Sequence, residues 1–174
     1  MIVPVIGAPG TGKTSLLKAI TERYGTPHFE LSWMPEFMRM NGVRIDYVQD
    51  ERIAIQALFA VAREYAHSGH RVVFVSDFRL ETLDQVEQAA LDFQHTIKLV
   101  SSDDAILQTR VLDDTRPSGY RDVKEALEAN RKYIAMQSPN SIHIDVAKTP
   151  LDEVVRIVAE AVLIPNSAVQ STTP

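Results

Sequence analysis

The stretch Val5–Thr14, VIGAPGTGKT, joins an apolar run to a glycine-rich turn that ends in Lys-Thr. The pattern G-x-x-x-x-G-K-[ST] is satisfied here by Gly7, Gly12, Lys13 and Thr14. Glycines let backbone N–H groups converge on a phosphate without obstruction by Cβ atoms, and the positive end of the following helix points at the same place. The stretch therefore predicts a nucleoside triphosphate site.

Each part of this phosphate loop has an expected role. Lys13 should reach the β- and γ-phosphates of ATP, and the Thr14 hydroxyl should bind Mg²⁺. The alternative, a glycine-rich turn with a surface lysine, is disfavoured because the motif follows a strand and opens a helix. The expected nucleotide contacts are Gly7, Ala8, Pro9, Gly10, Thr11, Gly12, Lys13, Thr14, Ser15 and, later in the chain, Arg110.

Short β-like runs alternate with longer helical patterns along the rest of the chain, which is typical of a parallel sheet with helices on both faces. Expected strands are Ile2–Ile6, Pro27–Leu31, Arg71–Ser76, Thr96–Val100 and Ser141–Val146. Expected helices are Thr14–Tyr24, a long one between an N-cap at Asp50 and a C-cap at Gly69, Glu81–Phe93, Asp103–Leu112, Asp122–Met136 and Pro150–Leu163. The pattern predicts an α/β fold of three layers, with a five-stranded parallel sheet in one domain over 1–164 and a disordered tail over 165–174.

Composition limits the classes of function. The chain has 174 residues, no cysteine and a formal net charge of −5. The acidic balance argues against broad binding of nucleic acid, which needs a basic face. Without cysteine, a signal-like N-terminus or a long apolar run, we expect a cytoplasmic protein with no membrane segment.

Charged residues follow two of the expected strands, where ligands of such sheets bind. Asp77, directly after VVFVS, is a candidate for holding Mg²⁺ or orienting a nucleophile, and Arg79 is a candidate substrate contact. After the second strand, Glu36 and Arg39 are three residues apart, so one helical turn would place them on one face. Glu36 could take a proton from a substrate hydroxyl and Arg39 could hold an anion, although a capping role for Asp77 and a solvated Glu36–Arg39 ion pair are the alternatives.

The segment Arg110–Asp122 carries three arginines interrupted by helix breakers. Arginines on a mobile segment can close over a transferring phosphate, so we expect a lid near 110–122. Arg116 is the first candidate for stabilising charge in the transition state, and Arg121 is a candidate substrate contact. The alternative is a charged, exposed loop.

These features together resemble the P-loop kinases of small molecules, which include nucleotide, deoxynucleoside, shikimate and gluconate kinases. The resemblance spans roughly Met1–Leu163 and implies a P-loop NTPase fold that uses ATP and Mg²⁺. MPEFMR, DERIAIQALFAVAREYA and RVVFVSDFRLET look most like the nicotinamide riboside kinase type. That likeness implies a general base or hydroxyl contact at Glu36, a substrate or phosphate contact at Arg39 and a metal-side role for Asp77. DTRPSGYR is more similar to thymidylate-kinase-like lids.

The sequence therefore predicts a kinase that moves the γ-phosphate of Mg-ATP to a hydroxyl or phosphate of a small molecule, with nucleosides and nucleotides as first candidates. Either Glu36 or Asp77 would be the base. A regulatory NTPase without a small-molecule acceptor and a kinase of nucleic-acid ends are the alternatives. The acceptor and the oligomeric state, a homodimer included, stay open.

Overall fold

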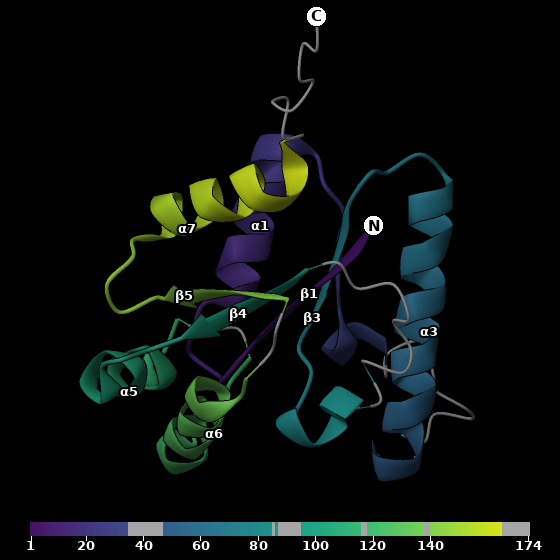
Figure 1. Cartoon of the computed structure of the whole chain (residues 1–174). Coiled ribbons are helices and arrows are strands. Elements are labelled where there is room, and N and C mark those ends of the chain that lie inside the picture. Colours follow the sequence, from purple (N-terminus) through teal and green to yellow (C-terminus); the bar gives the residue numbers. More distant parts are fainter. Residues whose placement is uncertain (35–46, 85, 87–94, 116–117, 138–139, 165–174) are drawn as a thin grey trace, which may run out of the picture.

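A computed structural model describes residues 1–34, 47–84, 86, 95–115, 118–137 and 140–164. Its centre is a five-stranded sheet in the order β2-β3-β1-β4-β5, with every neighbouring pair parallel (Figure 1). The strands are β1 Ile2–Gly7, β2 His28–Glu30, β3 Val73–Ser76, β4 Thr96–Val100 and β5 Ser141–Asp145. The predicted α/β fold is confirmed.

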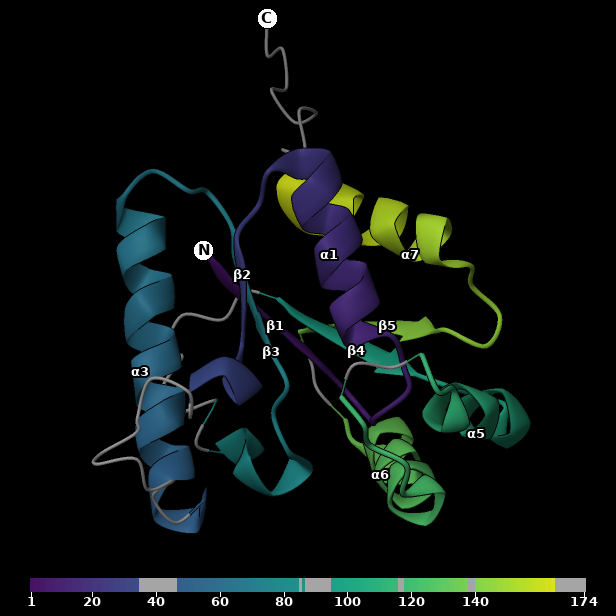
Figure 2. The same cartoon turned by 180° about the vertical axis from the view of Figure 1, so that it is seen from behind.

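Helices cover both faces of this sheet, α1 and α7 on one side and α3 and α6 on the other (Figures 1 and 2). Their bounds are α1 Lys13–Tyr24, α3 Tyr47–His67, α5 Asp104–Leu112, α6 Val123–Ala135 and α7 Leu151–Val158, with a π-helical turn at Ala159–Leu163 after α7. Short 3-10 turns at Leu31–Trp33 and Leu80–Thr82 follow β2 and β3. No helix in these described ranges is long and apolar enough to cross a bilayer.

Strand alternation divides the core into two clusters. Val3, Val5 and Phe74 face α1 and α7, where they pack with residues such as Leu16 and Val155. Ile6, Val73 and Val75 face the other way, toward α3 and α6. Because both faces are covered, β1 and β3 are buried along almost their whole length, which explains their continuous apolar sequences.

The residues that cap the helices define where several helices begin. Asp103 and Asp122 are N-caps: the Asp103 carboxylate accepts the Ala105 N–H at 2.8 Å, and that of Asp122 accepts the Glu125 N–H at 2.9 Å. The N-cap prediction for Asp50 is wrong, because α3 begins three residues earlier, at Tyr47. Nothing in Tyr47–Gln49 breaks a helix, so a good capping residue did not mark the start.

Other predictions lie outside the described residues. After the 3-10 turn Leu80–Thr82, residue 85 and residues 87–94 are not described, so the expected helix Glu81–Phe93 stays a prediction. The same holds for the tail over 165–174.

The carboxyl ends of the parallel strands meet at one edge of the sheet. β1 is the first strand in sequence but lies third in the sheet, between β3 and β4. The strand order therefore reverses beside β1, and a crevice outside the sheet at such a point is the usual ligand site of open α/β sheets. Gly7 ends β1, Glu30 ends β2 and Ser76 ends β3, so all three lie at this edge.

Candidate active site

The phosphate loop leaves the end of β1 and enters α1 through two glycines with positive φ. Gly10 has φ of +89° and Gly12, the N-cap of α1, has φ of +87°. The Thr11 hydroxyl donates to the Ala8 carbonyl at 2.8 Å and closes the turn. The loop therefore sits at the N-terminus of α1, where free N–H groups and the helix dipole favour an anion.

Gly7 and Gly12 provide a matched test of this backbone. A Cβ at Gly7, where φ is +149°, would clash with the Leu99 carbonyl oxygen of β4, whereas a Cβ at Gly12 meets nothing within 4 Å. Gly7→Ala should lower the free energy of unfolding by about 3 kcal/mol or more, from strain and overpacking together. Gly12→Ala should lower it by about 1–2 kcal/mol, from the left-handed conformation alone. Urea unfolding of both variants measures this difference, and equal losses would contradict the close approach of β1 and β4.

Lys13 is the first residue of α1, and its ammonium lies over the loop. Its Nζ donates to the Gly7 carbonyl at 2.8 Å and to the Ala8 carbonyl at 3.2 Å. The charge is thus held at the mouth of the loop, within reach of any phosphate that the loop N–H groups would bind.

Glu30, at the carboxyl end of β2, was not identified as a site residue from the sequence. It is 7% exposed, and its Oε1 has no hydrogen-bond partner within the described ranges. Its register partner on β3 is Ser76, whose buried hydroxyl likewise lacks a partner there. A buried polar atom without a partner is unfavourable unless a ligand or an ordered water completes its bonding. This pair of atoms therefore indicates a ligand-facing position.

The charges around Glu30 link it to the phosphate loop. Burial raises the pKa of the Glu30 carboxyl above its usual 4.5, while a hydrogen bond with Thr14 lowers it. Repulsion from Asp77 raises this pKa further, and the nearby ammonium groups of Lys13 and Lys18 lower it. Glu30 consequently lies among the loop threonine, the loop lysine and the aspartate after β3. The sequence could have pointed to Glu30, because it is a carboxylate at the end of an expected strand and lies at the same edge of the sheet as Asp77.

Asp77 follows β3 in an unusual backbone conformation. It is the non-glycine residue with positive φ, at 73°, in the described part of the chain. Aspartate tolerates this region better than most residues, but a strained position of this kind still costs about 1–3 kcal/mol. The Asp77 side chain is half-buried and lies close enough to Glu30 to raise the pKa of the Glu30 carboxyl. Its role at a metal or a nucleophile stays a prediction.

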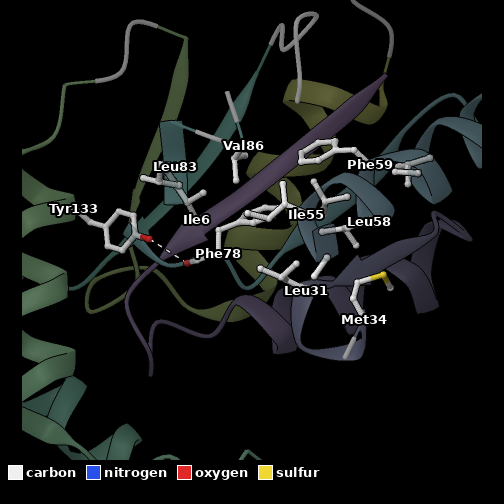
Figure 3. Packing of buried hydrophobic residues seen from close by; sticks show 14 of the residues in the cluster. Ile6, Leu31, Met34, Ile55, Leu58, Phe59, Phe78, Leu83, Val86 and Tyr133 are labelled. Atoms are coloured by element: carbon white, nitrogen blue, oxygen red, sulfur yellow. Dashed lines mark hydrogen bonds between the residues drawn. The ribbon is translucent and has the colours of Figure 1, made fainter. Parts of the chain in front are cut away.

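Helix α6 contacts the segment after β3 through Tyr133, whose hydroxyl lies against the backbone of Phe78 (Figure 3). The Tyr133 ring is buried, and its hydroxyl donates to the carbonyl of Phe78 at 3.4 Å and lies in hydrogen-bond contact with the Gly7 backbone. Burial, with the carboxylates of Glu81 and Asp77, raises the pKa of this hydroxyl, so it stays a neutral donor. One turn earlier, the Asn130 amide pairs with both backbone groups of Ser101, at 3.0 and 2.8 Å.

Arg79, an expected substrate contact, is engaged with α3. Its Nε donates to Glu51 Oε1 at 3.0 Å, and a terminal guanidinium nitrogen donates to the other oxygen. The Glu51 side chain is 6% exposed and that of Arg79 is 49% exposed. A buried carboxylate thus holds the guanidinium in a two-bonded fork beside the Asp77 loop.

The remaining expected arginines lie on the side of α5 and α6. Arg110, near the end of α5, donates to the Val146 carbonyl after β5 at 3.1 Å. Arg121 donates to the Tyr120 carbonyl at 2.9 Å and lies 3.9 Å from Asp114. Arg116, Glu36 and Arg39 lie outside the described residues, so their roles stay predictions. Met34 is core, whereas Trp33 is 41% exposed and packs against the ring of His28.

The donor set at this edge fits Mg²⁺ bound together with a nucleotide. Magnesium needs only one or two carboxylates in addition to phosphate oxygens and water. Thr14 supplies a hydroxyl, Asp77 a carboxylate, and Glu30 a buried oxygen that lacks a partner within the described ranges. No group of three or more metal-binding side chains occurs in the described ranges, so the protein alone offers no complete metal cage there.

One family model matches more than half of this chain. The model of the family described as "ATPase family associated with various cellular activities (AAA)" matches residues 3–97, more than half of the 174 residues. A search of curated proteins gave no significant match.

Solved structures with a similar fold include three from bacteria. A gluconokinase from Sinorhizobium meliloti 1021 is 24% identical, with a TM-score of 0.55 over 92% of this chain and 89% of that one. The tunicamycin resistance protein of Deinococcus radiodurans is 19% identical, with a TM-score of 0.67 over 92% and 94%. A sugar kinase from Janibacter sp. HTCC2649 is 14% identical, with a TM-score of 0.60 over 91% and 92%. The chain belongs to the ATPase family associated with various cellular activities (AAA), and its fold is that of the P-loop small-molecule kinases.

Proposed function

We propose that the chain is an ATP-dependent phosphotransferase that moves the γ-phosphate of Mg-ATP to a hydroxyl or phosphate of a small molecule, with nucleosides and nucleotides as first candidates. One observation carries this proposal: the buried carboxylate of Glu30, with an oxygen unpartnered within the described ranges, lies beside Thr14, Lys13 and Asp77 of the phosphate-loop edge. Phosphoryl transfer to a hydroxyl uses a phosphate site with a proton acceptor beside it, and this edge of the sheet offers both.

The residues divide into a nucleotide side and an acceptor side. The loop N–H groups and Lys13 would hold the phosphates of ATP and stabilise charge as the γ-phosphoryl group moves. Arg110, Arg116 and Arg121 would approach from the segment 110–122. Thr14 and Asp77 would hold Mg²⁺, which neutralises phosphate charge when bound.

The acceptor oxygen would attack the γ-phosphorus while the bond to the β–γ bridging oxygen breaks and ADP leaves. The proton of the acceptor hydroxyl would go to a carboxylate. Glu30 is placed for this role because burial raises its pKa and so makes it a better base at neutral pH. Asp77 and Glu36 are the other candidates.

The similar structures support a kinase, since two of the three named above are a sugar kinase and a gluconokinase. The third is a tunicamycin resistance protein.

A test of the proposal measures ADP release from Mg-ATP with a panel of nucleosides, nucleotides, sugars, sugar acids and shikimate, each at saturating concentration. We expect at least one acceptor to raise the rate about tenfold or more above the rate with ATP alone, since a bound acceptor replaces water at the reacting centre. ADP release that no acceptor changes would contradict the proposal and favour a regulatory NTPase. Labelling of an oligonucleotide end, run in parallel, tests the third class.

A further inference from the structure

Helix α6 is fixed to β4 and the residue after it at two places. The fully buried Asn130 side chain accepts the Ser101 N–H at 3.0 Å and donates to the Ser101 carbonyl at 2.8 Å. At the end of the helix, the buried Lys98 of β4 donates to the Met136 carbonyl at 2.6 Å. Tyr133 lies between these two anchors, so its position at the edge of the sheet is fixed by them.

The Tyr133 hydroxyl joins two neighbouring strand ends (Figure 3). It donates to the carbonyl of Phe78, which follows the end of β3 at Ser76 by two residues, at 3.4 Å. Burial raises the pKa of this hydroxyl and a hydrogen bond from the Gly7 backbone lowers it, so the same oxygen also accepts from the last residue of β1. Tyr133 is 2% exposed, so bulk water does not compete for these bonds.

Each of these strand ends leads into one part of the candidate site. Gly7 begins the phosphate loop, and Phe78 directly follows Asp77, whose φ of 73° is strained. Such a conformation persists only where the surrounding structure holds it. Phe78 is held from two sides, because its carbonyl accepts from Tyr133 and its ring stacks on Phe59 of α3, with the ring centroids 6.1 Å apart.

The Asp77 carboxylate lies near both Tyr133 and Glu30. Burial is the main cause of the raised pKa of these two groups, and the negative charge of Asp77 raises both values further. Phosphoryl transfer depends on the placement of charged groups, and a displacement of about 1 Å can cost about 100-fold in rate. The contacts that fix Asp77 against the phosphate loop therefore bear on the rate.

We propose that Tyr133 is a positioning residue, whose hydroxyl fixes the segment that carries Asp77 against the phosphate loop and so sets the place of the Asp77 carboxylate relative to Mg²⁺ and the phosphates. Tyr133 acts through Asp77, and neither a proton nor a phosphoryl group passes through its hydroxyl. This inference rests on the function proposed above and adds to it a residue that no sequence motif marks.

A double-mutant cycle tests whether Tyr133 acts through Asp77. Tyr133→Phe removes the hydroxyl and keeps the ring, and Asp77→Asn removes the charge and keeps a residue type that tolerates positive φ. We expect Tyr133→Phe to lower kcat by about tenfold or more and to change KM for ATP by less than about threefold, because the phosphate loop itself is kept. In the Asp77→Asn background the same change should lower kcat by less than about twofold. An equal loss in both backgrounds would overturn the inference.

Nucleotide binding gives a second readout that does not depend on turnover. The affinity of the full chain for a non-hydrolysable ATP analogue is measured by calorimetry with and without Mg²⁺. We expect Tyr133→Phe to reduce the gain in affinity from Mg²⁺ by about threefold or more, because the Asp77 carboxylate is no longer pre-organised. An unchanged gain would overturn the inference. If the native chain binds the analogue but transfers phosphate to no acceptor, the proposed function fails, and this comparison still decides the role of Tyr133.

Two controls separate positioning from a loss of stability. Tyr133→Phe and Val158→Ala, the latter in the core cluster beside α1, should each lower Tm by about 3–8 °C, but Val158→Ala should keep kcat at the native value. Tyr24→Phe, at a tyrosine that is 45% exposed, should change neither. An equal loss of kcat in Val158→Ala would overturn the inference. If Tyr133→Phe does not fold, Phe78→Leu, which loosens the segment that Tyr133 holds, takes its place in both measurements, and a lack of coupling to Asp77 would then overturn the inference.

Discussion

Lys13→Ala is expected to reduce kcat for ATP turnover by about 10²–10³-fold or more, which is the usual effect of removing one donor from a transition-state anion site. The ammonium lies 2.8 Å from the Gly7 carbonyl, at the mouth of the loop. No other lysine among the described residues contacts the loop carbonyls. The charge that Lys13 brings to the γ-phosphate would therefore have no substitute from the loop.

The fold of Lys13→Ala should change little, because alanine is a good helix former at the start of α1. Lys124→Ala, at an exposed position on α6, is the control and should keep normal turnover. Lys13→Arg should also be impaired, since a planar guanidinium does not reproduce the point charge of lysine. Steady-state kinetics and thermal unfolding of the three variants are the measurements. Normal turnover by Lys13→Ala would show that the loop is not a catalytic phosphate site.

Glu30→Gln should have the second large effect, with activity and stability changing in opposite directions. The general-base contribution of a carboxylate is about 10²–10⁴-fold, so kcat should fall by at least about 100-fold. At neutral pH the variant should be more stable, because a buried charge with an unpartnered oxygen is replaced by a neutral amide. We expect Tm to rise by about 2–4 °C, because a gain of about 1 kcal/mol in the free energy of unfolding shifts Tm by this amount in a domain of this size.

The pH dependence of this stabilisation follows from the raised pKa. A carboxyl group whose pKa is raised on folding binds its proton more tightly in the folded state. Its contribution to stability is therefore fully present below the unfolded pKa, 4.5, and is lost as pH rises through the folded value. The gain from Glu30→Gln should accordingly be largest at neutral pH and vanish below about pH 4.5.

Glu22→Gln, at an exposed site on α1, is the control and should change neither activity nor stability. Unfolding measured at several pH values together with kcat separates the two effects. A Glu30→Gln variant with normal kcat would leave Asp77 or Glu36 as the base.

The sequence predicted most reliably the features that depend on neighbouring residues. The strand Thr96–Val100 was predicted at its observed bounds, and the phosphate loop follows β1 as expected. Both rest on local chemistry: a buried parallel strand needs a continuous apolar run, and the loop needs glycines where φ is positive. The loop glycines could be read from spacing alone for that reason.

Features that depend on tertiary contacts were predicted less well. Glu30 lies inside HFEL, where a charged residue in a short strand suggests a solvent-facing position. It is buried instead, and its neighbours Thr14 and Ser76 are distant in sequence. The strand was also expected to end at Leu31, one residue too late, so the search for polar groups after each strand began beyond Glu30. Similarly, no local sequence pattern predicts that Arg79 donates hydrogen bonds to Glu51, which is 28 positions away.

The fate of the γ-phosphate tests the central claim most directly. ATP labelled with heavy oxygen in its γ-phosphate would be incubated with the native chain and the best acceptor from the panel, and the products would be separated by mass. The account predicts that the label appears in the acceptor, which gains the mass of one phosphate, with little free inorganic phosphate, and that Lys13→Ala abolishes this transfer. If the label appeared only in inorganic phosphate, and the rate of its release did not depend on the acceptor, the proposal that the chain is a phosphotransferase would be contradicted.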